Sequence, residues 1–147
     1  MNSVAEEAFK TWLEDEGITA PVHTGLTADR IPNAGQHISC YLQSNEHVVG
    51  PLYKGDMAIT IATSPHSHAD EDEDFTDALD DHRTLCASVR ALIEGYDSTD
   101  LDSTFATATG DAFSGLFIRD EQSSVDDGRW ITTINFMFGS RRGEGTP

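Results

Sequence analysis

Apolar residues recur at intervals of three and four in two long runs, one near the start of the chain and one in its middle. The first run predicts an amphipathic helix over residues 3–16, ended by Gly17. The second begins at Phe75 and predicts a helix of about twenty residues, ended by Gly95. A short helix is also expected between Leu101 and Phe105, which lie one helical turn apart.

Strict alternation of apolar and polar residues predicts the strands. HISCYL and MAITIAT, residues 37–42 and 57–63, each place their larger apolar side chains on one face. SGLFIRDEQ and GRWITTINFMF form a second pair, separated by SSVDD, and Asp127-Gly128 is a turn signal between them. The last of these runs carries large apolar groups on both faces, which is typical of a strand in the middle of a sheet.

These elements predict a single α+β domain over residues 1–140. We expect a mostly antiparallel sheet of about four strands with two helices packed on one face. Residues 141–147 lack a large apolar side chain, so they are expected to form a flexible C-terminal tail. Residues 44–56, with two glycines and a proline, are expected to form a long loop that contacts another subunit.

The formal net charge of -17 is the strongest compositional feature. Binding to a phosphate backbone or to anionic lipids depends on Lys and Arg, and the chain has only nine of them. The sequence also lacks a secretory signal and any stretch of roughly 20 apolar residues that would cross a bilayer. We therefore expect no membrane partner and no broad nucleic-acid surface, in a protein made and used in a cytoplasm or in a particle assembled there.

The stretch HSHADEDED, residues 66–74, raises the question of a metal site. His66 and His68 supply at most two ligands, and the acidic run lacks the glycine turn and the later glutamate of a calcium loop. We expect a solvated segment that leads into the middle helix, with no bound metal. His82, on the apolar face of that helix, is expected to be a hydrogen-bonded core histidine.

Known catalytic motifs are absent from the sequence. It has no GxSxG, no phosphate-binding GxxxxGK[ST], no HExxH and no GxGxxG after a strand. The two cysteines, Cys40 and Cys86, lie among apolar neighbours and are expected to be buried without forming a disulfide. The sequence therefore predicts no enzyme, no catalytic residues and no cofactor.

Five stretches carry the order and pattern of a known family: VAEEAFKTWLEDEG, MAITIATSP, DFTDALDDHRTLCASVRALIEG, LDSTF and, above all, DDGRWITTINFMF. Together they resemble the small tail-terminator, or tail-completion, proteins of long-tailed bacteriophages. In that family a turn with Asp and Gly, then an aromatic residue and a Thr-rich alternating strand, close the domain. The resemblance implies a ring, usually of six subunits, that caps the tail tube and joins it to the head-side connector.

The negative charge suits such a role. A terminator must let DNA slide through, and an acidic lumen offers the phosphates no gain from counterion release. The implied location is the tail or neck of a virion, with tail tube and connector proteins as partners and no specific DNA binding. Three other interpretations stay open: another neck or head-tail adaptor protein, an acidic DNA mimic, and an acidic protein-binding module.

Subunit contacts of such a ring are expected in the 44–56 segment and on the second face of the last strand. Apolar groups there would supply attraction, and arginines would meet acidic neighbours. The candidate interface residues are Val48, Val49, Leu52, Tyr53, Arg129, Ile131, Met137, Arg141 and Arg142.

Overall fold

The computed structural model describes residues 2–65, 71–126 and 128–145, which form an α+β fold as the sequence predicts. The helices are α1 (Asn2–Asp15), α2 (Glu71–Glu94) and α3 (Leu101–Thr109), with short 3-10 helices at Ala28–Arg30 and Tyr96–Ser98. The strands are β1 (Val22–Thr24), β2 (Gln36–Val49), β3 (Leu52–Thr63), β4 (Ala112–Asp126) and β5 (Arg129–Arg141).

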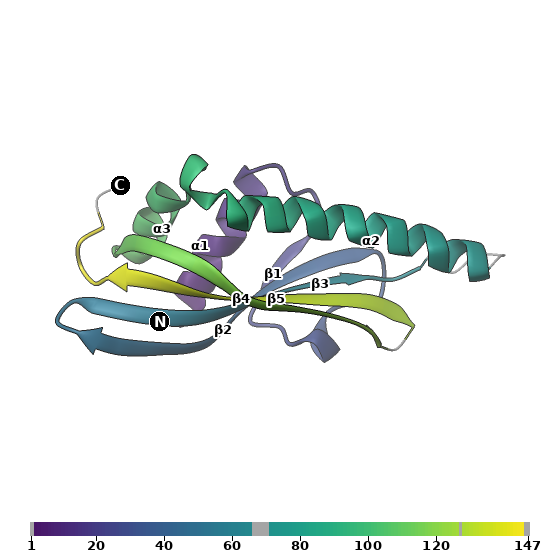
Figure 1. The fold of residues 1–147 in the computed structure, drawn as a ribbon, viewed down its shortest axis with the longest axis horizontal. Coiled ribbons are helices and arrows are strands. Elements are labelled where there is room, and N and C mark those ends of the chain that lie inside the picture. Colours follow the sequence, from purple (N-terminus) through teal and green to yellow (C-terminus); the bar gives the residue numbers. More distant parts are fainter. Residues whose placement is uncertain (1, 66–70, 127, 146–147) are drawn as a thin grey trace.

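The strands form one mixed sheet in the order β1-β2-β3-β5-β4. Two long hairpins, β2–β3 and β4–β5, supply the antiparallel part, and β3 pairs with β5 at its centre. The short strand β1 pairs parallel to β2, which is one strand more than expected. The hairpin turns lie at opposite ends of the sheet, so the molecule is elongated along its strands (Figure 1).

All three α-helices cover the same face of the sheet (Figure 1). On the opposite face lie the 3-10 helix Ala28–Arg30 and the loop around it (Figure 1). Two helices were expected on one face, and α3 adds a third because Leu101 and Phe105 are buried in the same core. We call the two sides of the sheet the helix side and the outer face.

The core lies between the helices and the sheet, and Phe9 of α1 stands at its centre. The centre of its ring lies 5.2 Å from that of Phe136 and 5.3 Å from that of Phe138, and the ring planes are inclined by 65° and 63°. Such edge-to-face contacts add to the free energy gained by burying the rings. The α1 helix is further fixed to the sheet by Glu6, whose buried Oε2 accepts the backbone N–H of Leu42 at 2.8 Å.

The expected loop at residues 44–56 is instead the half of the β2–β3 hairpin that lies next to its turn. Ser44 pairs with Asp56, His47 with Tyr53 and Val49 with Leu52, and the hairpin turns at Gly50 and Pro51. The glycine and proline positions favoured a loop, but β5 continues alongside β3 as far as Leu52 and holds this half extended. The prediction of a long loop was therefore wrong.

Within the expected flexible tail, residues 141–145 form hydrogen bonds with the rest of the chain. Arg141 ends β5, the N–H of Arg142 donates to the Pro51 carbonyl at 2.8 Å, and the N–H of Gly143 donates to Asp111 at 2.9 Å. Backbone N–H groups of the tail donate in these contacts, so the lack of apolar side chains did not reveal them. His66, His68 and Asp70 lie outside the described residues, and α2 begins at Glu71, earlier than expected.

Candidate assembly surface

The outer face is defined by the register of the two central strands. Thr63 and Thr132 contact His82 of α2, so the positions that alternate with them on β3 and β5 point away from the helices. The outer-face residues of these strands include Leu52, Lys54, Asp56, Ala58, Thr60 and Ala62 on β3, and Ile131, Thr133, Asn135, Met137 and Arg141 on β5.

One end of the outer face is covered by the loop around the 3-10 helix Ala28–Arg30. Ile31 of this loop packs against Ala62 and Ile131 in a small second core. The Arg129 guanidinium donates to the carbonyl of Ala28 at 2.6 Å and to that of Ile31 at 2.7 Å. Arg129 and Ile131 are only 3% and 5% exposed, so they have little surface to offer another subunit. Their assignment to the interface is corrected on this ground.

The middle of the outer face is open. Met137 is half-buried there, and its cross-strand neighbour Phe117 of β4 is 57% exposed. Polar groups surround this pair: Arg119 Nη1 donates to Asp56 Oδ1 at 2.8 Å. A large exposed aromatic ring beside ordered charges is typical of a protein contact surface.

The tip of the β2–β3 hairpin is the second exposed apolar feature. Val48 and Val49 are 54% and 62% exposed, and Leu52 lies opposite Val49 on the outer face. On the helix side of the same hairpin, the guanidinium of Arg142 lies 4.0 Å from the centre of the Tyr53 ring. This cation-π contact presents a fixed positive charge beside the exposed valines.

The neighbouring Arg141 is exposed and is held by Glu144 at 3.2 Å. Of the nine candidate interface residues, the structure thus brings six together around the hairpin tip: Val48, Val49, Leu52, Tyr53, Arg141 and Arg142. Met137 lies further along the outer face, and Arg129 and Ile131 lie under the loop.

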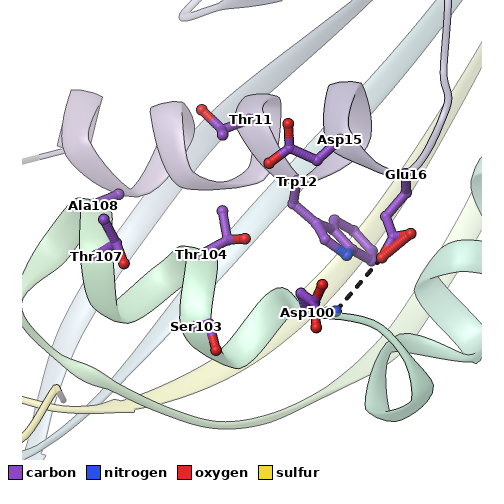
Figure 2. Close-up of a pocket in the computed structure, with 9 residues that line it drawn as sticks. All are labelled: Thr11, Trp12, Asp15, Glu16, Asp100, Ser103, Thr104, Thr107 and Ala108. Atoms are coloured by element: carbon purple, nitrogen blue, oxygen red, sulfur yellow. Dashed lines mark hydrogen bonds between the residues drawn. The ribbon is translucent and has the colours of Figure 1, made fainter. Parts of the chain in front are cut away.

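A groove of about 630 Å³ runs between α1 and α3 (Figure 2). Three carboxylates, those of Asp15, Glu16 and Asp100, line it together with hydroxyl groups of both helices. Trp12 forms its floor and donates from its indole N–H to Thr99 Oγ1 at 2.9 Å. The groove provides hydrogen-bond acceptors, but the residues lining it include neither a histidine nor a cysteine that could pair as base and nucleophile.

Among the described residues, His82 and Cys86 form a pair that could suggest thiol chemistry, since Cys86 Sγ lies 3.5 Å from His82 Nε2. Both side chains are buried, and His82 bonds to Thr63 and Thr132 at 2.8 Å each, as expected for a core histidine. Burial raises the pKa of the Cys86 thiol and lowers the pKa of His82. Both shifts favour the neutral forms, whereas a catalytic dyad needs a thiolate.

The two cysteines are free and buried, as the sequence predicted. Over the described ranges, no group of three or more His, Cys, Asp or Glu side chains is placed to hold a metal ion. The segment His66–Asp70 lies outside those ranges, so the prediction that it binds no metal stays a prediction.

No protein-family model matches the chain, and a search of the curated proteins finds no match. The helices of the described part of the chain are all too short or too polar to cross a membrane. The class of molecule defined by its own geometry is an acidic α+β protein with helices on one side of its sheet and a half-open outer face.

Sequence reasoning missed the central part of this surface. Phe117, Arg119 and Asp120 lie on β4. The alternation of apolar and polar residues predicted a strand there, but did not indicate which of its faces packs against the helices. The alternation in FIRDE is broken by a bulge between Ile118 and Asp120, so the facing of the residues beyond it could not be predicted. No signal in the sequence marks Asp56 as the partner of Arg119.

Proposed function

We propose that this chain is a virion structural protein that acts as a tail terminator. Copies of it form a ring that ends the tail tube, joins it to the head-side connector and lets DNA pass without specific binding. The observation that carries this proposal is the open outer face with its exposed Phe117, next to the apolar tip at Val48 and Val49. A ring subunit needs two such surfaces, because each copy contacts one neighbour on either side.

The charge supports the same function. With a formal net charge of -17 per copy, a ring lumen built from this chain repels phosphate groups instead of binding them. The same charge makes the copies repel one another, so assembly has to rest on apolar contacts and local ion pairs. Salt screens repulsion over about 10 Å at 0.1 M. Assembly is therefore expected to strengthen as salt is raised.

The experiment is size-exclusion chromatography with light scattering over a range of salt concentrations, with and without isolated tail tubes. A ring that forms more readily at higher salt, and that binds the end of a tube, supports the terminator function. A ring that ignores tubes favours another neck or head-tail adaptor protein. A chain that stays monomeric under every condition contradicts the proposal and favours an acidic DNA mimic or protein-binding module.

A charge reversal at the hairpin end tests the function in the particle. The double substitution Arg141→Glu with Arg142→Glu is expected to weaken the ring without unfolding the domain, because both side chains are exposed. In infected cells it should give filled heads and tails that fail to join. Arg30→Glu with Arg83→Glu is the matched control, since it changes two other exposed arginines and the net charge by the same amount.

A further inference from the structure

A recess of about 240 Å³ lies in the middle of the outer face and is lined by Gln43, Asp56, Arg119, Asp120 and Asn135. Asn135 Nδ2 donates to Asp120 Oδ1 at 2.7 Å. Its other side-chain atom, Oδ1, is buried and has no hydrogen-bond partner among the described residues. A buried acceptor of this kind is favoured only when a donor meets it.

The charges around the recess favour a cationic donor. Arg119 already pairs with Asp56, whereas no cation of the described chain forms an ion pair with Asp120. The recess therefore holds two carboxylates against one guanidinium, beside an unused amide oxygen. Phe117, across from Met137, offers its exposed ring at the same level of the sheet. A planar guanidinium can stack on such a ring while it donates to a carboxylate and an amide, which an ammonium does less well.

Arg142 is a guanidinium of this chain that fits these requirements. It is exposed, lies on the ring of Tyr53 and forms no ion pair with any described carboxylate. The exposed Val48 and Val49 stand on the same hairpin and can contact Phe117 when Arg142 enters the recess. Lys54, Arg90, Arg119 and Arg141, in contrast, each pair with a carboxylate of their own chain.

Arg142 cannot fill the recess of its own copy. It lies over Tyr53 on the helix side at the hairpin end, whereas the recess opens on the outer face around Asn135. We propose that the recess binds Arg142 of a second copy, so that the hairpin end of each subunit docks on the outer face of the next. Such a head-to-tail contact generates a ring or a filament. The proposal rests on the ring assembly proposed above and names its contact.

A charge exchange tests this contact. Asp120→Arg gives a copy whose recess and hairpin are both positive, and Arg142→Asp gives a copy in which both are negative. Each variant alone is expected to associate roughly 30-fold or more weakly than the unchanged chain. In an equimolar mixture every contact again joins opposite charges, so the mixture should assemble as well as the unchanged protein. Sedimentation velocity compares the two variants and their equimolar mixture with the unchanged chain. Urea unfolding checks that each variant is folded.

Restored assembly in the mixture supports the contact between the recess and Arg142 of a second copy, since a folding defect in either variant would persist after mixing. The contact is contradicted if either single variant associates as strongly as the unchanged chain. It is also contradicted if the mixture associates no more strongly than the two variants do separately. Either result leaves the terminator function standing as long as the unchanged chain forms a ring. An unchanged chain that stays monomeric at every salt concentration and with tail tubes overturns both. Arg142→Lys, which keeps the charge but loses the planar group, should weaken association by roughly 3- to 10-fold.

Discussion

Arg129 Nη1 donates a hydrogen bond to the carbonyl oxygen of Ile31 at 2.7 Å, across 98 positions of the sequence. This bond ties the first residue of β5 to the loop that covers one end of the outer face. The guanidinium is almost fully buried, and its oxygen partners in the described chain are backbone carbonyls. The buried positive charge is tolerated here because the carbonyl oxygens of Ala28, Ile31 and Pro32 accept hydrogen bonds from it.

Replacing Arg129 by alanine is expected to lower the free energy of unfolding by about 2 to 3 kcal/mol. The change removes the side-chain donor of the buried Ile31 carbonyl and one of the two donors of the part-buried Ala28 carbonyl. Urea unfolding measures the loss. Arg141→Ala is the control, because its exposed pair with Glu144 contributes at most about 1 kcal/mol. Equal losses in the two variants would contradict the buried role of Arg129.

Acidification from pH 7 to 5 should destabilise the protein through His82. Burial lowers the pKa of His82 below its ordinary value of 6.5, so the unfolded chain takes up a proton before the folded one does. Stability is then greatest above pH 6.5 and falls as the pH drops through that value, by at most about 1.4 kcal/mol per pH unit for one group. Unfolding curves at several pH values measure the slope.

His82→Gln should reduce that slope, since the replacement has no proton to gain. His23 contributes as well, because burial and the neighbouring His37 lower its pKa. The slope that remains in His82→Gln should therefore be reduced further by adding His23→Gln. A slope unchanged by both substitutions would show that other groups control the acid response.

Phe9→Ala should cost about 3 to 5 kcal/mol of unfolding free energy. The side chain is fully buried, and its ring contacts aromatic rings of α3 and β5. Denaturant unfolding is again the measurement, and Val4→Ala on the exposed side of α1 is the control. A loss below about 1 kcal/mol would mean that the aromatic cluster is not the centre of the core.

Phe117→Thr should leave the monomer almost as stable but weaken association roughly tenfold or more. The ring is exposed on the outer face, and threonine keeps a high preference for strands. Val125→Thr is a close control, because Val125 is 51% exposed on the same strand but pairs with Trp130, on the helix side. Light scattering at fixed salt compares the two. Equal effects of both substitutions would contradict a role for the outer face.

The spacing of apolar residues along the sequence was sufficient to predict an α+β fold. Phe9 and Leu13 on one face of α1, and Ile59 and Ile61 on one face of β3, are buried as their spacing predicted. These predictions held because a helix or strand with one apolar stripe has to bury that stripe whatever it packs against. The same reasoning placed His82 in the core, on the apolar face of α2.

The tertiary structure alone decided which parts of that fold are open. Residues 52–56 became strand because β5 runs beside them, and residues 44–49 became strand by pairing with 52–56. Arg129 became an interior residue because a loop almost a hundred positions away supplies its acceptors. The recess at Asn135 likewise exists only because a bulge in β4 brings Asp120 opposite that residue. The spacing of apolar residues predicts which face of a helix or strand is buried. Whether the other face is exposed depends on segments far away in the sequence, which that spacing does not contain.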